Sequence, residues 1–377
     1  MISGAKHKKH GDLARSERGG FGMNEVALLG TTCEEIQRIT AHIRSFFPGY
    51  DIAFVDADHN EEQPSSHGTR WQKRSTVIGV SSALPDNGFQ RRTALWQCDA
   101  IIVNGNHFEA KSQVIICDST KEASLRKRSS QLTNVTAIIL ADGMEELPSY
   151  VKELVPGYER LEIIALHDEE GLRAFFAKEY LRPVALKGLI MTGGRSTRMG
   201  RDKSTIIHHE EEQYLHLAKL MTKLGVEPYI SCRADQQAFF TGQGLNVIAD
   251  RMIDVGPIGG ILSAFMREPD VSWMVLACDI PLIDQPLLEE LIASRRPTHT
   301  ATVFRNETHH MPEPLIAIWE PRAYLIIMQF MAQGYSCPRK VLMNSNAHII
   351  STAQHEKLRN VNTVAELDEF KRQRSSQ

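Results

Sequence analysis

The sequence of 377 residues is marked first by what it lacks. No apolar run reaches about 18 residues, the length that a transmembrane helix needs. The net charge of −3 gives no pull toward nucleic acid or an anionic membrane surface. Its six cysteines form no CxxC pair, which argues against a zinc site or a disulfide framework. Scattered single thiols are typical of a reducing compartment, so we expect a cytoplasmic protein.

The first 22 residues contain little that is apolar and carry five Lys or Arg against two Asp or Glu. Such a composition cannot bury enough apolar surface to fold on its own. We therefore expect residues 1–22 to be a disordered leader or a segment foreign to the native chain, with a nucleic-acid-binding arm as the alternative. Met23 is then the expected start of the folded part.

From residue 23 onward, short apolar runs alternate with amphipathic stretches. In the first half, the runs EVALLG, DIAFVDAD, CDAIIVNG, SQVIICD and VTAIILAD are predicted strands, and CEEIQRITAHIRSFF, LPSYVKELV and HDEEGLRAFFAKEYL are predicted helices. Continuous apolar strands separated by helices indicate a mostly parallel sheet with both faces covered. The first half, residues 23–182, is therefore predicted to be one α/β domain.

Pro183 marks the predicted domain boundary, because proline lacks an N–H group and disfavours helix at the residue before it. The alternation then restarts over residues 183–377, with strands at LKGLIM, EPYISC, LNVIAD and SWMVLACD and a late hairpin-like pair at TATVFRN and EPLIAIWE. Helices are expected between these runs, and a last one at VAELDEFKRQ with a capping box at Thr363 and Glu366. We expect a second domain with a doubly wound, mostly parallel sheet.

The second domain opens with the stretch LKGLIMTGGRSTRMGRDKSTI, in which an apolar strand runs into two glycines and a basic loop. Glycines let backbone N–H groups approach an anion closely and form a concave nest for it. Gly193 and Gly194 are thus candidate phosphate-binding residues, and Arg198 and Lys203 are candidates for neutralising a polyphosphate. The pattern is neither GxxxxGK[ST] nor GxGxxG. A turn with a solvated basic face is the alternative.

Two further strands of this domain end on carboxylates. Asp250 ends GLNVIAD and precedes Gly-Pro-Ile-Gly-Gly at a helix start, and Asp279 ends WMVLACD. Residues at the carboxyl ends of parallel strands line the edge at which ligands bind in such sheets. We therefore expect Asp250, Asp279 and the glycine loop to lie at one edge.

These motifs together resemble the molybdenum cofactor guanylyltransferase (MobA) family of glycosyltransferase-A-like, Rossmann-like nucleotidyltransferases. Four of that family's motifs occur in order over about 190 residues: LAGGxSxRMGxDK at 191–203, D…GPLAG at 250–260, CDxP at 278–281 and NxNTPEEL at 360–367. The family's Leu-Ala stands here as Met191-Thr192, and its base-proximal Asn as Ser231.

The resemblance implies transfer of GMP from GTP to a terminal phosphate of molybdopterin, with release of pyrophosphate. It implies Mg²⁺ held by Asp279, a nucleotide site with Asp250 reading guanine, and Lys203 and Arg198 as catalytic cations on the phosphates. The implied residue set comprises, for the nucleotide, Met191, Thr192, Gly193, Gly194, Lys203, Ser231, Asp250 and Asp279, and, for the pterin side, Asn360, Asn362 and Arg339.

Rival functions remain open from the sequence. A cytidylyltransferase for the same cofactor and a sugar-phosphate nucleotidyltransferase would use the same phosphate chemistry. A non-catalytic carrier of pterin or nucleotide is the alternative of another class.

The first domain faintly resembles MobB, the GTP-binding adaptor of molybdenum cofactor synthesis, but it lacks the Walker motif. Positions 35–37 are Glu-Ile-Gln, and Glu34 and Glu35 would repel a phosphate at the helix start. The expectation is a degenerate adaptor that docks to, or presents cofactor to, the transferase domain. An unrelated domain that stabilises a dimer is the alternative.

Overall fold

The computed structural model describes residues 13–57, 88–192, 212–252 and 254–359, and the backbone of two short strands within 70–81. The chain divides into two compact units: residues 17–182 form one, and residues 183–377 together with the N-terminal segment up to residue 16 form the other. The division falls between Arg182 and Pro183. No helix among the described residues combines the length and hydropathy needed to cross a lipid bilayer.

The N-terminal unit contains a six-stranded, wholly parallel sheet in the order β2-β5-β1-β6-β7-β8. Its strands are β1 (Glu25–Leu29), β2 (Ile52–Val55), β5 (Ala100–Asn104), β6 (Ser112–Cys117), β7 (Val135–Leu140) and β8 (Glu162–Ala165). Its helices are α1 (Cys33–Ser45), α2 (Gly88–Ala94), α3 (Glu122–Lys127), α4 (Ser149–Leu154) and α5 (Glu169–Tyr180). A separate antiparallel pair joins β3 (Arg70–Arg74) to β4 (Val77–Ser81).

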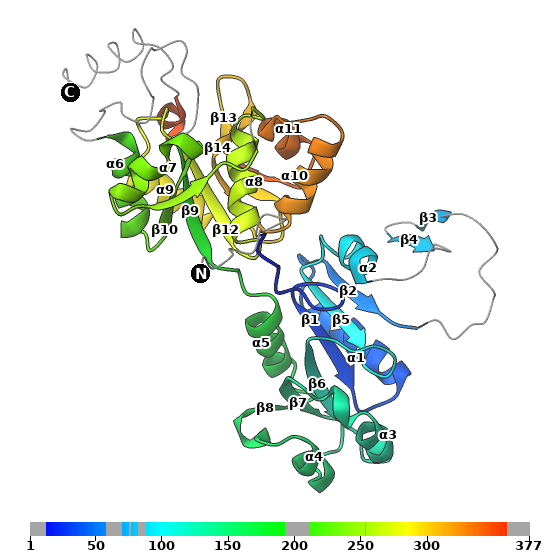
Figure 1. Cartoon of the computed structure of the whole chain (residues 1–377). Helices are drawn as coiled ribbons and strands as arrows, with labels where there is room; N and C mark the ends of the chain where they lie inside the picture. The colour runs from blue at the N-terminus through cyan, green and yellow to red at the C-terminus, as the bar shows by residue number, and fades with distance from the viewer. Residues whose placement is uncertain are drawn as a thin grey trace, which may run out of the picture. The chain divides into compact units, whose positions relative to one another are not determined.

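The sheet of this unit is buried on both faces, as its continuous apolar strands predict. In β1, Leu28 packs with α1 and α5 on one face, while Leu29 packs with α3 and α4 on the other. Both leucines are fully buried. Figure 1 shows the helices placed on either side of this sheet.

Part of the segment expected to be a disordered leader belongs to the folded units. Phe21 is only 3% exposed, and the Glu25 carboxylate accepts hydrogen bonds from the backbone N–H groups of Phe21 and Gly22. Ala14 donates its N–H to the Met266 carbonyl of the C-terminal unit's own core. Composition misses these contacts because they use the backbone and one aromatic ring rather than an apolar run.

The C-terminal unit contains a seven-stranded mixed sheet in the order β11-β10-β9-β12-β14-β13-β15. Its strands are β9 (Leu186–Met191), β10 (Glu227–Cys232), β11 (Asn246–Ala249), β12 (Ser272–Ala277), β13 (Ala301–Asn306), β14 (Met311–Trp319) and β15 (His348–Ile350). Its helices are α6 (Gln213–Lys223), α7 (Gln237–Gly242), α8 (Pro257–Arg267), α9 (Gln285–Ala293), α10 (Ala323–Ala332) and α11 (Pro338–Met343).

Strands β11, β10, β9 and β12 are parallel, and β14 then runs antiparallel to β12 and to β13. In β9, Ile190 packs with α6 and α9 on one face, whereas Leu189 and Met191 pack with α8 and α10 on the other. The sheet therefore has helices on both faces (Figure 1), and the α/β prediction with a mostly parallel sheet is confirmed.

Candidate functional site

The exit of β9 is tied to the neighbouring strand β10 by Thr192. This residue is 3% exposed, and both its N–H and its Oγ1 donate to the carbonyl oxygen of Ser231, over 3.0 and 2.8 Å. The threonine that replaces the family's alanine thus turns its hydroxyl into the sheet. Thr192 therefore holds the end of β9 against β10.

Ser231, at the end of β10, is connected to Asp250 just beyond β11. The buried Ser231 Oγ donates to Asp250 Oδ1 over 2.9 Å, and the Asp250 N–H donates to the Cys232 carbonyl over 2.8 Å. Burial raises the pKa of Asp250, and the hydrogen bond from Ser231 opposes that rise. The two predicted nucleoside residues therefore meet at the carboxyl edge of the parallel strands, where Asp250 is a half-buried hydrogen-bond acceptor.

The glycines that open α8 allow a close approach to this pair. Gly256 precedes the helix with φ of 74°, a left-handed conformation that side chains other than glycine disfavour. A Cβ on Gly260 would lie 2.5 Å from Ser231 Oγ and 2.6 Å from Met191 Cε. The first turn of α8 therefore packs directly on Ser231 and Met191, which explains why glycine occupies this position.

Asp279 lies two residues beyond β12, at the same edge of the sheet. In the antiparallel pairing of β12 with β14, Leu276 lies opposite Ile316. Beyond this pair, Cys278 and Asp279 form a turn after β12, and Glu313 lies near the start of β14. Glu313 is 3% exposed; burial is the main cause that raises the pKa of its carboxyl, the Arg339 charge lowers it, and the Asp279 charge raises it again. The two carboxylates are thus close enough to interact.

The donor set at this edge fits a hard divalent cation. No group of three or more His, Cys, Asp or Glu side chains forms a metal site among the residues that the structure describes. The Asp279 carboxylate instead suits Mg²⁺, which takes one or two carboxylates and fills its remaining positions with phosphate oxygens and water. The buried Oδ1 atom of Asp279 places one oxygen of this carboxylate inside the edge rather than in bulk solvent.

Arg339, on α11, contacts the start of β14. Its Nε donates to the Pro312 carbonyl over 3.1 Å, and its Nη2 lies 3.4 Å from Glu313 Oε2. Its side chain is 34% exposed, against 5% for that of Glu313. The guanidinium is therefore anchored on one side by β14 and faces solvent on the other.

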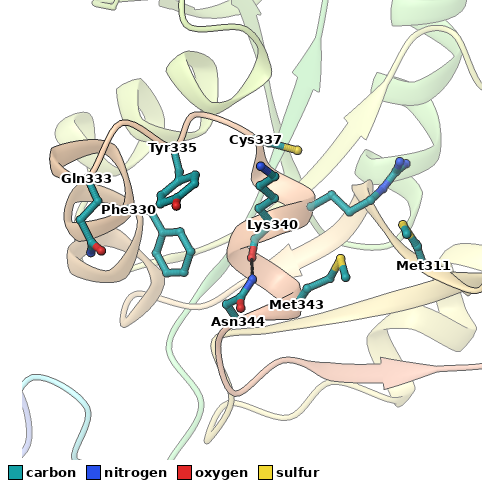
Figure 2. Close-up of a pocket in the computed structure, with 9 residues that line it drawn as sticks. Met311, Phe330, Gln333, Tyr335, Cys337, Lys340, Met343 and Asn344 are labelled. Atoms are coloured by element: carbon teal, nitrogen blue, oxygen red, sulfur yellow. Dashed lines mark hydrogen bonds between the residues drawn. The ribbon is translucent and has the colours of Figure 1, made fainter.

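A pocket of about 670 Å³ adjoins Arg339, between α10, α11 and the start of β14 (Figure 2). Its lining combines aromatic rings, sulfur-containing side chains, amides and two cations, namely Met311, Phe330, Gln333, Tyr335, Cys337, Arg339, Lys340, Met343 and Asn344. Lys340 Nζ lies 5.2 Å from the centre of the Tyr335 ring. The pocket can thus accept a planar molecule that also carries negative charge.

Several predicted residues lie outside the described part of the chain. These are Gly193, Gly194, Arg198, Lys203, Asn360 and Asn362. Conversely, the sequence prediction missed Glu313. The available signal was an acidic residue inside the otherwise apolar run MPEPLIAIW, which a strand buries only when a charge or a ligand compensates it.

The helix start that follows β1 in the N-terminal unit is capped by its own chain. Thr32 accepts the Glu35 N–H at its side chain over 3.1 Å, and the Glu35 carboxylate binds Arg38. Glu34 and Glu35 in the first turn complement the positive end of the helix dipole. The side chains of Thr32, Glu34 and Glu35 thus satisfy this helix start, where a bound anion would otherwise lie.

The chain is similar to known proteins of molybdenum cofactor synthesis. The family model for the MobA-like NTP transferase domain matches residues 188–349. A molybdenum cofactor biosynthesis bifunctional protein of Synechocystis is 32% identical over 178 residues, covering 47% of this chain and 51% of that protein. This chain thus spans about half the length of that relative.

Two further similarities cover nearly whole proteins. A molybdenum cofactor guanylyltransferase of Pseudomonas paraeruginosa is 34% identical over 182 residues, which are 46% of this chain and 89% of that enzyme. The solved structure of molybdopterin-guanine dinucleotide biosynthesis protein A from Archaeoglobus fulgidus is 22% identical, with a TM-score of 0.42, over 51% of this chain and all of that one.

Proposed function

The chain belongs to the molybdenum cofactor guanylyltransferase family, and from this membership we propose that it transfers GMP from GTP to molybdenum-loaded molybdopterin. An oxygen of the acceptor's terminal phosphate forms a bond to the α-phosphorus of GTP. The bond from that phosphorus to the bridging oxygen breaks, and pyrophosphate leaves. The products are the guanine dinucleotide form of the cofactor and pyrophosphate.

The observation that carries this proposal is the convergence of Ser231, Asp250 and Asp279 at one carboxyl edge of the sheet. Asp250 is the proposed guanine reader, because its carboxylate can accept hydrogen bonds from N1–H and the exocyclic amine of guanine. Adenine offers no such pair of donors, and a wrong base would leave a half-buried carboxylate unsatisfied. Ser231 orients that carboxylate through its bond to Oδ1.

The proposed metal is Mg²⁺, held by Asp279. When bound, it supplies positive charge to the phosphate oxygens and favours departure of pyrophosphate. Phosphoryl-type transfer depends mainly on positioning and charge neutralisation, with little covalent help from the protein. Lys203 and Arg198, which lie outside the described residues, are the proposed cations for the β- and γ-phosphates, with Gly193 and Gly194 supplying backbone N–H groups.

The acceptor side is proposed to lie at Arg339 and its adjoining pocket. A guanidinium with N–H groups directed to solvent suits a phosphate, and the Phe330 and Tyr335 rings suit a planar pterin (Figure 2). Asn360 and Asn362, outside the described residues, are proposed to assist there.

The N-terminal unit is proposed to be an adaptor that docks to, or presents cofactor to, the transferase unit, rather than a second nucleotide site. The capped and acidic start of α1 supports this proposal, because phosphate would have to displace Glu34 and Glu35 from that end. The cytoplasm is the proposed compartment, since all six cysteines, each within the described residues, are thiols.

One assay tests the proposed reaction. The whole chain is incubated with Mg²⁺, molybdenum-loaded molybdopterin and either GTP or CTP, and pyrophosphate and the dinucleotide product are quantified. Product with GTP alone supports the proposal. Product with CTP alone would identify a cytidylyltransferase. Nucleotide or pterin binding without pyrophosphate release would identify a carrier.

A further inference from the structure

Glu313 is a buried acid that interacts with two charged residues of the proposed transferase site. On one side, the Asp279 charge acts on its carboxyl. On the other, its Oε2 lies 3.4 Å from Nη2 of Arg339. An acid that is 3% exposed is costly to bury, and such groups occur where a charge compensates them.

The Arg339 guanidinium needs Glu313 as a partner in order to keep its orientation. Arginine is a long side chain with many rotamers, and holding it in one of them costs conformational entropy. The Pro312 carbonyl and the Glu313 carboxylate engage Nε and Nη2 from one strand. The guanidinium is thereby fixed against β14, and its other N–H groups can meet a phosphate bidentately.

The same pairing engages Arg339 with a carboxylate other than that of Asp279. Without Glu313, the guanidinium could pair with the Asp279 carboxylate, whose charge acts on Glu313. An arginine paired with Asp279 would compete with a divalent cation for the same oxygens.

We propose that Glu313 is a positioning residue of the transferase site, which holds Arg339 toward the acceptor's phosphate and thereby reserves Asp279 for the metal. This inference rests on the proposed GMP transfer, and it adds a residue that touches neither nucleotide nor acceptor. Glu313 acts through Arg339, so the two residues should behave as one unit.

The test compares the parent with E313Q, R339A and the double variant E313Q/R339A, with separate measurement of KM for acceptor, KM for GTP and the Mg²⁺ concentration at half-maximal rate. Glutamine preserves volume and a hydrogen-bond acceptor while removing the charge. We expect E313Q to raise the acceptor KM about tenfold, as for loss of one charge-assisted hydrogen bond. The GTP KM should stay within about twofold. E313Q should also raise the Mg²⁺ requirement, and R339A in the same chain should restore it.

The matched control is E320Q. Glu320 forms a buried pair with Arg295 at the other end of β12, with Nε and Oε1 2.7 Å apart. E320Q removes the same charge from the same kind of pair and should lower thermal stability without changing the acceptor KM. Thermal unfolding and calorimetric GTP binding report whether each variant is folded.

The outcomes separate the inference from the function it rests on. A parent chain that transfers no GMP overturns the proposed function. An active parent with an E313Q variant of unchanged acceptor KM overturns only the positioning role. If the double variant keeps the raised Mg²⁺ requirement of E313Q, Glu313 is a metal ligand. That result also overturns the positioning role.

Discussion

Ser231 Oγ and Asp250 Oδ1 are joined by a hydrogen bond of 2.9 Å, which links the ends of two adjacent parallel strands. The serine is fully buried, whereas the aspartate is half-buried. The bond therefore fixes the plane of a carboxylate at the edge where a ligand can reach it. A fixed acceptor plane suits recognition of a planar base.

Asp250→Ala should erode the preference for GTP over ATP more than it slows pyrophosphate release. Hydrogen bonds to a charged acceptor contribute about 1.5–3 kcal/mol each, so loss of one should cost roughly 10- to 100-fold in selectivity. Calorimetric affinities of both nucleotides for parent and variant measure the effect. An unchanged ratio of GTP affinity to ATP affinity would show that Asp250 only stabilises the loop. CTP would then again be a candidate substrate.

Asp250→Asn should raise the free energy of unfolding at neutral pH. Burial raises the pKa of Asp250 above its ordinary value of 3.8, so the folded state disfavours the charged form. Its contribution to stability is most favourable below that ordinary value and declines as pH rises through the folded pKa. The gain in the variant should thus shrink as pH falls toward 4. Urea unfolding between pH 4 and 7 measures this, and a gain independent of pH would contradict it.

Asp279→Asn should remove Mg²⁺-dependent turnover while nucleotide binding survives in weakened form. Loss of a charged metal ligand should raise the barrier by about 3 kcal/mol or more, a fall of about 100-fold at least. Initial rates of pyrophosphate release over a range of Mg²⁺ concentrations give the result. Activity within a few-fold of the parent would remove Asp279 from the metal site.

Gly260→Ala should weaken GTP binding and destabilise the C-terminal unit by about 1–3 kcal/mol, because its Cβ would overlap Ser231 Oγ and Met191. Gly242→Ala is the matched control: it ends α7, where an added Cβ meets nothing within 4 Å. That control should gain up to about 1 kcal/mol and bind GTP normally. Equal effects of the two substitutions on Tm and GTP affinity would show that crowding at Ser231 is unimportant.

Residues 183–377 alone should fold and transfer GMP to the cofactor, because every site residue named for that reaction lies after Pro183. Circular dichroism and the pyrophosphate assay test the fragment against the whole chain. The fragment lacks the Ala14 contact to Met266, so a modestly lower Tm is expected. A folded but inert fragment would mean that the N-terminal unit supplies part of the site.

The sequence predicts the parallel strands and their ends well. Apolar runs of four to six residues became β9 to β12, and the residues that end or follow them lie where the sheet edge requires. The short elements that were not predicted are α2, α3, α11, β3, β4, β8 and β15, since segments of three to seven residues carry too little periodicity.

Side-chain directions and cross-strand partners could not be predicted from the sequence. The resemblance names Thr192 among the nucleotide residues, but the structure shows that its hydroxyl donates to the Ser231 carbonyl. The partners of Glu313 follow from no local motif, because Asp279 and Arg339 come from other elements that lie apart from it in the chain. Such information exists only once the sheet is assembled.

The reversal of strand direction between β12 and β14 also divides the proposed site into a nucleotide side and an acceptor side. The nucleotide side is built from the ends of parallel strands, which are joined by the crossover helices α6, α7 and α8. Glu313 and Met311 instead belong to the beginning of β14, directly after a short surface turn at 307–310 in which His310 has φ of 56°. A change in the length of this hairpin turn could therefore alter the specificity for the acceptor, during evolution or in an engineered enzyme. The nucleotide-binding strands would keep their geometry.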